Sequence, residues 1–187
     1  MEEKLVSILK RSKEIVDCLQ MLKDSPISRF EYYLAGGAIY QTIFNYLHGY
    51  DLNYGIKDYD IIYFDDSNLS YEAEDQVIKE VKKFFKDFDM GINLDIKNEA
   101  RAHIWLKEKY NENLEKYNNL EEVLRSWGFS ACSIGVRMEG NSVKVLAPYG
   151  LEDLFNMKIR KVGNYDITEK ARDLKNKWPN IDISLVE

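Results

Sequence analysis

The chain has 187 residues, 45% of them hydrophobic and 13% aromatic, and its formal net charge is −6. This length favours a single domain, and this composition can fill a hydrophobic core, which excludes a disordered protein. The acidic balance argues against general binding of polyanions. Nucleic acid could be a partner only through a local basic patch or a bound metal, and the net charge does not indicate it.

The two cysteines, Cys18 and Cys132, lie far apart and have no neighbours at metal-ligand spacing. We expect both to be reduced and buried, which fits a cytoplasmic protein. No apolar run reaches the length of a signal peptide or a transmembrane helix, so no membrane partner is expected.

The first third of the chain reads as helical. Apolar residues at helical spacing predict an amphipathic helix over residues 3–23, stopped by the turn residues 24–26. A short apolar segment, 30–35, leads into the glycine pair 36–37, and a second helical stripe covers residues 39–47.

The middle of the chain alternates between strand and helix patterns. β-branched and aromatic residues predict a strand over 58–64. A long helix is expected over 71–88, and an alternating strand over 92–96. Residues 99–118 are mixed and mostly helical, and residues 119–127 form a short helix.

The last third predicts a β-hairpin from residues 131–138 and 142–147, then helices over 151–157 and 168–178. This order indicates an α/β (α+β) fold, with a small mixed β-sheet flanked by helices that lie largely on one side. We expect one domain over 1–187. It has a helical N-terminal segment at about 1–25 and a basic C-terminal helix at about 165–187.

Three acidic residues are candidate metal ligands. Asp58 and Asp60 start the first predicted strand, and alternation puts both side chains on one face. Such a pair repels itself unless a divalent cation lies between. Asp95, on a strand expected beside the first, could lie about 5 Å away across the sheet. The three acids predict a site for Mg²⁺, with Mn²⁺ as the alternative metal. The simpler explanation for Asp58 and Asp60 is an exposed strand start, and for Asp95 it is an ion pair with Arg101.

Gly36 and Gly37 open the second helix. A helix N-terminus offers unpaired N–H groups, and glycine lets a phosphate approach the backbone closely. The pair could therefore hold the far phosphates of a nucleoside triphosphate. It could equally be a tight turn that lets a helix pack on a strand.

The glycine pair and the three acids resemble the motifs of the polymerase-β-type nucleotidyltransferase superfamily. The likeness is strongest to a small bacterial nucleotidyltransferase family, through residues 98–105 and 147–155 as well, and it spans roughly residues 30–160. It implies a nucleotidyltransferase-like domain and metal-dependent transfer of a nucleoside monophosphate from an NTP to a hydroxyl acceptor. Asp58, Asp60 and Asp95 would be its catalytic metal ligands. The chain departs from the pattern in its 20 residues between Gly37 and Asp58 and in Gly37 itself, where serine is frequent.

Arg101 and His103 are candidate nucleotide-binding residues. If their segment is extended, both share the face of Asp95 and could contact a phosphate or a base. Otherwise Arg101 pairs with Glu99 or Asp95 and His103 is a packed ring. The basic residues between 158 and 177 are either a solvated helix face or a patch for an anionic substrate.

Three functions therefore remain open: a nucleotidyltransferase, a non-catalytic nucleotide- or metal-binding regulatory module, and a structural partner-binding domain. With two histidines and no nucleophile elbow, acyl-transfer chemistry has little support. The acceptor, the base and the oligomeric state are not readable from the sequence.

Overall fold

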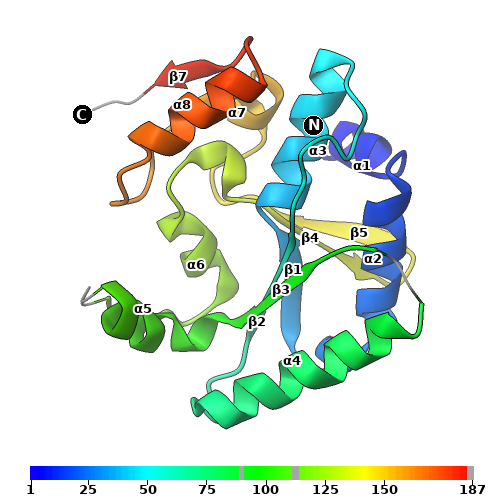
Figure 1. The fold of residues 1–187 in the computed structure, drawn as a ribbon, viewed down its shortest axis with the longest axis vertical. Helices are drawn as coiled ribbons and strands as arrows, with labels where there is room; N and C mark the ends of the chain where they lie inside the picture. Colours follow the sequence, from blue (N-terminus) through cyan, green and yellow to red (C-terminus); the bar gives the residue numbers. More distant parts are fainter. Residues whose placement is uncertain (89–90, 111–113, 185–187) are drawn as a thin grey trace.

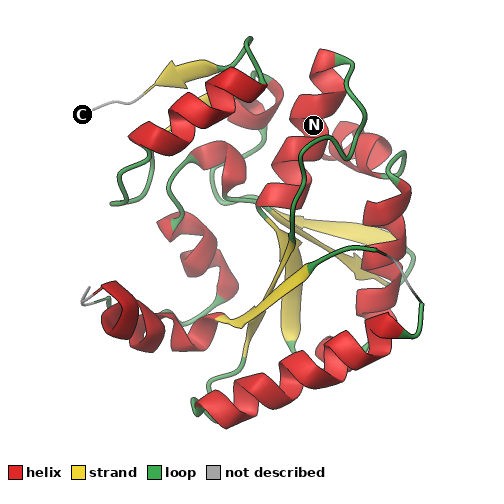
Figure 2. Cartoon of the chain, viewed as in Figure 1, coloured by secondary structure: helices red, strands yellow, loops and turns green. Residues whose placement is uncertain are grey.

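A five-stranded mixed sheet forms the centre of the molecule. The computed structural model describes residues 1–88, 91–110 and 114–184. The strand order is β3-β2-β1-β4-β5; β2 and β3 run parallel, and the other neighbours run antiparallel (Figure 2). The strands of this sheet are β1 (Glu31–Ala35), β2 (Tyr59–Phe64), β3 (Leu94–Asn98), β4 (Gly135–Glu139) and β5 (Ser142–Leu146).

Helices cover both faces of the sheet, with α2 and α4 on one side and α5 and α6 on the other (Figure 1). None of the helices in the described ranges is long and apolar enough to cross a membrane. The helices are α1 (Glu2–Leu9), α2 (Lys13–Asp24), α3 (Gly37–His48), α4 (Tyr71–Lys86), α5 (Ala102–Tyr110), α6 (Leu120–Ser126), α7 (Glu152–Phe155) and α8 (Thr168–Lys177). Three 3₁₀ turns, η1 (Pro26–Arg29), η2 (Glu99–Arg101) and η3 (Ser130–Cys132), and a parallel strand pair, β6 (Lys158–Arg160) with β7 (Asp182–Ser184), complete the fold.

The two faces of the sheet bury different amounts of apolar surface. Alternation along β2 sends Ile61 and Tyr63 into the large core beneath α1 to α4. It sends Ile62 to a smaller cluster on the opposite face, where Val123 and Leu124 of α6 pack. Asp60 has the parity of Ile62 and therefore belongs to this thinly covered face.

The β2–α4–β3 crossover sets the geometry of the acids. Helix α4 starts at Ser70, whose side chain accepts a hydrogen bond from the N–H of Ala73. It returns the chain so that β3 pairs in parallel with β2. In this register Asp60 lies directly beside Asp95. The prediction that the second acidic strand adjoins the first is therefore confirmed.

The helix predicted over 3–23 is wrong in one respect, because the structure divides it into α1 and α2. Ser12 adopts an extended backbone, and its hydroxyl accepts a hydrogen bond from the N–H of Ile15, which starts a new helix. The apolar periodicity continues through the break, so it could not reveal the division.

The central strand β1 was not predicted as a strand. Four of its five residues are buried, so its apolar run has no alternating pattern to identify it. The small β6–β7 pair was also missed, since it joins segments more than 20 residues apart.

The C-terminal helix α8 is anchored to α3. Trp178, directly after α8, is fully buried, and its indole N–H donates to Asn45 Oδ1 at 2.9 Å. Its ring contacts Phe44 edge-on, with ring centroids 5.6 Å apart. This docking carries the basic end of the chain to the helix that begins with the glycine pair.

Candidate active site

A cavity of about 590 Å³ opens on the thinly covered face of the sheet. Its polar wall is the strand edge with Asp60, Asp95 and Lys97. The opposite wall is largely apolar and aromatic. That wall includes Ala102, Trp105, Leu106, Tyr117, Val123, Trp127 and Tyr165. The cavity thus joins a charged end to a flat, apolar end.

The carboxylate of Asp60 is partly buried on the cavity wall. Burial, reinforced by the charge of Asp58, raises the pKa of Asp60 to about 6; Asp95 raises it further, while Lys97 and the backbone N–H of Gly37 act in the opposite direction. The three acids are therefore close enough to interact. Their mutual repulsion is the condition that a divalent cation relieves.

Asp95 is engaged in the structure by Lys97, whose Nζ donates to Asp95 Oδ2 at 2.7 Å. Among residues 1–88, 91–110 and 114–184, no group of three or more His, Cys, Asp or Glu side chains is arranged to hold a metal ion. The carboxylate oxygens of Asp60 and Asp95 on the cavity wall still suit a hard cation, while Asp58 lies just before β2 and does not line the cavity. Lys97 engages Oδ2 of Asp95, so it would compete with a metal ion for this carboxylate.

The glycine pair adjoins the acids. Gly36 caps α3 with φ of 55°, and its N–H donates to the carbonyl of Ile134 at 2.9 Å. A Cβ on Gly36 would lie 2.5 Å from Cζ3 of Trp127, and a Cβ on Gly37 would lie 3.5 Å from Oδ2 of Asp60. Gly36 thus permits close packing, whereas Gly37 presents the helix N-terminus to the acidic end.

A lysine cluster lies near the N-terminal half of α3. Lys177 donates to Oε1 of Gln41 at 2.6 Å. Burial, followed by the charges of Lys170 and Lys57, lowers the pKa of Lys177 to about 8. Within the described ranges, no carboxylate forms an ion pair with these three lysines. The lysine cluster (Lys57, Lys170 and Lys177) is an unneutralised cationic site in an acidic protein.

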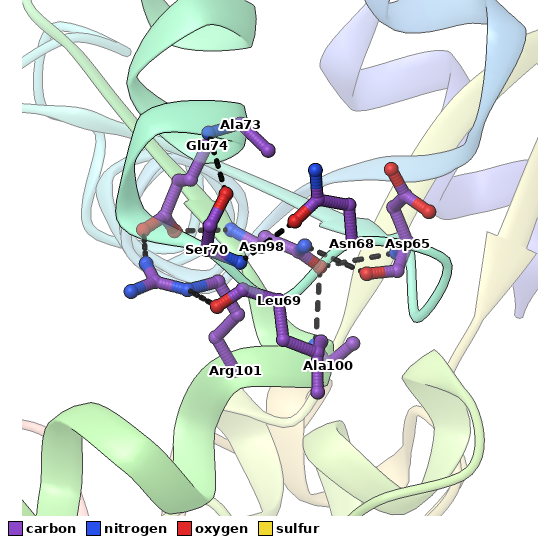
Figure 3. A network of polar contacts seen from close by, with 9 residues as sticks. All are labelled: Asp65, Asn68, Leu69, Ser70, Ala73, Glu74, Asn98, Ala100 and Arg101. Atoms are coloured by element: carbon purple, nitrogen blue, oxygen red, sulfur yellow. Dashed lines mark hydrogen bonds and ion pairs between the residues drawn. The ribbon is translucent and has the colours of Figure 1, made fainter.

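The structure does not bring Arg101 to the cavity. Its guanidinium forms a buried ion pair with Glu74 of α4 and donates through Nε to the carbonyl of Leu69 at 3.0 Å (Figure 3). The partners considered from the sequence, Glu99 and Asp95, are therefore not the ones it takes.

His103 is also absent from the cavity wall. The side chain of His103 is half-buried in α5. The prediction that His103 and Arg101 share one face applied only if their segment were extended. Residues 99–110 instead form η2 and α5, so residues two apart point in different directions. Of the seven predicted site residues, the structure puts Asp60 and Asp95 on the cavity wall. Gly37 and Asp58 lie close to Asp60, and Gly36 packs against Trp127, whereas Arg101 and His103 lie away from the cavity.

Sequence reasoning missed two residues of the cavity wall, Lys97 and Glu99. Burial raises the pKa of Glu99 to about 7; Lys97 opposes this shift, and Asp60 and Asp95 add to it. Alternate residues of a strand point to the same face, so the odd-numbered positions 95, 97 and 99, on β3 and just after it, were expected to lie on one face. This spacing is the sequence signal that could have identified Lys97 and Glu99.

A mixed sheet that presents acids beside a glycine-capped helix, over a cavity with an aromatic wall, defines an α/β domain suited to a phosphorylated aromatic ligand. The family model described as Nucleotidyltransferase matches residues 29–183. The chain belongs to this family and is a nucleotidyltransferase, as the resemblance of its motifs implied.

Solved structures agree on the fold. An NMR structure described as revealing a CCA-adding enzyme head domain matches with a TM-score of 0.75 and 20% identity, over 98% of this chain and 96% of that one. A tRNA-processing enzyme in an apo form matches with a TM-score of 0.52 and 15% identity, over 89% of this chain and 44% of that one. No match was found among curated proteins. The mixed sheet flanked by helices is thus confirmed as a nucleotidyltransferase-like fold.

Proposed function

We propose that the chain moves a nucleoside monophosphate from a magnesium-bound NTP to a hydroxyl acceptor. The observation that carries this proposal is the register of β2 and β3. It sets Asp60 beside Asp95 at the charged end of the cavity, next to the N-terminus of α3. The family supplies the reaction class.

The triphosphate is assigned to the N-terminus of α3 and the lysine cluster. Helix N-termini attract anions through unpaired N–H groups and the helix dipole. Lys177 contacts this region through its hydrogen bond to Gln41 of α3. Lys57 and Lys170 lie close enough to Lys177 for their charges to lower its pKa. These groups would neutralise the phosphates and orient the α-phosphorus for attack, which is the main task of the protein in such transfers.

Asp58, Asp60 and Asp95 are the proposed metal ligands. A divalent ion bound there supplies positive charge to the phosphates and lowers the pKa of a nearby hydroxyl. The acceptor hydroxyl gives up its proton to solvent water, its oxygen bonds to the α-phosphorus, the bond to the β-phosphate oxygen breaks, and pyrophosphate leaves. Asp60 holds its charge in a largely buried place, which strengthens its effect on a bound cation.

The first acceptor class to test is an RNA 3′ hydroxyl. Two of the matching solved structures have descriptions that name RNA-processing enzymes, one as a CCA-adding enzyme head domain and the other as a tRNA-processing enzyme. The lysine cluster offers a local basic site in a chain of net charge −6.

Transfer of label from α-³²P NTPs tests the proposal. Purified protein is incubated with Mg²⁺, each labelled NTP and total RNA, and labelled RNA and released pyrophosphate are measured. We expect Asp60→Asn to abolish transfer while the melting temperature stays near that of the wild type. The control is Asp66→Asn, at an exposed position just after β2, which should retain transfer. Full activity in Asp60→Asn would refute the metal assignment.

A nucleotide-binding module without turnover is the second candidate. The ion pair between Lys97 and Asp95 favours it, because one predicted metal ligand is already engaged. NTP and Mg²⁺ that raise the melting temperature without pyrophosphate release, over all acceptors tried, would support the module. A purely structural domain would show no shift in melting temperature.

A further inference from the structure

Glu99 is a buried carboxyl group that the proposed reaction does not use. It is the first residue of η2, only 6% exposed, and it lines the cavity. Within the described part of the chain, no hydrogen bond reaches its carboxyl group; the groups acting on it are the charges of Lys97, Asp60 and Asp95. Buried polar groups normally have partners, so an unpartnered carboxyl facing a cavity indicates a ligand.

The neighbours of Glu99 hold it in this orientation. The side chain of Asn98 donates to the carbonyl of Asp65 at 2.8 Å and accepts from its N–H at 3.0 Å. On the other side, Arg101 is tied to Glu74 (Figure 3). Both anchors lie outside the cavity wall, so the backbone on either side of Glu99 is held while Glu99 itself lines the cavity.

The remainder of this end of the cavity is flat and apolar. Trp105, Tyr117 and Trp127 line it, and aromatic rings of this kind stack on nucleobases. From Asp95 to Glu99 the backbone extends at most about 13 Å, at roughly 3.3 Å per residue. A nucleotide with its phosphates at the acids can therefore place its base at Glu99.

We infer that the aromatic end of the cavity binds the base of the donor nucleotide, and that Glu99 selects bases carrying an exocyclic amino group over uracil. This inference rests on the proposed function. A carboxyl group accepts a hydrogen bond from the amino group of adenine, cytosine or guanine. Uracil presents carbonyl oxygens instead, and an ionised carboxylate has no proton to donate to them, so the comparison is made at pH 8.5, above the pKa of Glu99 of about 7.

The test compares binding of the four NTPs, each with Mg²⁺, by quenching of tryptophan fluorescence. Trp105 and Trp127 line the cavity, so a stacked base should quench their emission. We expect UTP to bind about 10- to 100-fold more weakly than the best amino-bearing NTP, as is typical of a lost specific base contact. Glu99→Gln should reduce this preference at least about tenfold, because its amide N–H can donate to a uracil carbonyl.

Glu108→Gln is the matched control, since Glu108 is exposed on α5, and it should keep the wild-type preference. Equal binding of all four NTPs to the wild type would overturn the inference and leave the proposed function standing, whether or not Glu99→Gln folds. An unchanged preference in folded Glu99→Gln would also overturn it. Failure of every NTP to bind would overturn the proposed function and this inference together.

Discussion

Asp60 and Asp95 are direct neighbours in the parallel register of β2 and β3, yet of these two acids only Asp95 forms an ion pair within the described residues, with Lys97. Burial, followed by the charge of Asp58, raises the pKa of Asp60 to about 6, although the charge of Lys97 partly opposes this shift. Lys97 therefore acts as an internal competitor for a cation at this end of the cavity.

Replacing Lys97 by methionine should strengthen Mg²⁺ binding. An opposite charge next to a carboxylate is worth about one to three pKa units, so we expect apparent Mg²⁺ affinity at pH 8 to rise about tenfold or more. Mg²⁺ titration followed by melting temperature measures this. Lys82→Met, at an exposed position of α4, is the control and should leave the titration unchanged. Unaltered Mg²⁺ affinity in Lys97→Met would contradict the competition.

Gly36→Ala should destabilise the fold more than Gly49→Ala. Both glycines have positive φ, 55° and 70°, but a Cβ at Gly36 would meet Trp127 whereas a Cβ at Gly49 would meet nothing within 4 Å. We expect Gly36→Ala to lower the free energy of unfolding by about 2–4 kcal/mol through strain and overpacking. Gly49→Ala should lose about 1–2 kcal/mol. Urea denaturation compares them, and equal losses would show that the contact with Trp127 is unimportant.

Arg101→Ala should act on stability and leave nucleotide affinity unchanged. Removing Arg101 leaves the buried carboxylate of Glu74 without a cationic partner, which should lower the free energy of unfolding by about 3–5 kcal/mol. Urea denaturation measures the loss. The double variant Glu74→Gln/Arg101→Met should be less destabilised than Arg101→Ala, because no unpaired charge remains. If Arg101→Met at low temperature is folded but has selectively weakened NTP binding, the arginine is a nucleotide contact after all.

The affinity for triphosphate should fall as pH rises through about 8. The lowered pKa of Lys177 means that its ammonium form, which binds phosphate, disappears in this range. Among the described residues, the groups that act on it include the charges of Lys170 and Lys57, the amide of Gln41 and the rings of Tyr54 and Trp178. Because the folded pKa lies below the ordinary value of 10.5, the charged lysine opposes folding below pH 8, and this opposition is lost as pH rises.

Lys177→Arg separates this titration from other pH effects, since arginine stays charged. We expect the dissociation constant of ATP with Mg²⁺ to increase between pH 7.5 and 9.5 in the wild type and to stay nearly flat in Lys177→Arg. Calorimetric titration at three pH values measures both. Parallel curves for the two proteins would remove Lys177 from the triphosphate site.

The acidic strands were readable because their signals are local. The β-branched and aromatic residues at 58–64 and the turn chemistry after them are contained within short windows, and so is the periodicity of α4. The central strand β1 had no such signal, because it is buried on both faces and its apolar run is compatible with either kind of element.

The side chains around the acids depended on long-range contacts. Lys177 meets Gln41 across 136 residues of sequence, and Arg101 meets Glu74 across 27. Each partner choice follows from how helices dock on the sheet, which no local pattern encodes. For this reason Arg101, a candidate nucleotide-binding residue from the sequence, is found instead paired with Glu74 of α4.

From the order of its amino acids alone, this chain could be recognised as a mixed α/β nucleotidyltransferase with candidate acids at 58, 60 and 95, because strand alternation and motif spacing are properties of neighbouring residues. Packing settled the rest: the parallel register that joins Asp60 to Asp95, the lysine held against Asp95, and the buried carboxyl of Glu99. These depend on which surfaces exclude water together, and that is established only once the whole chain has folded.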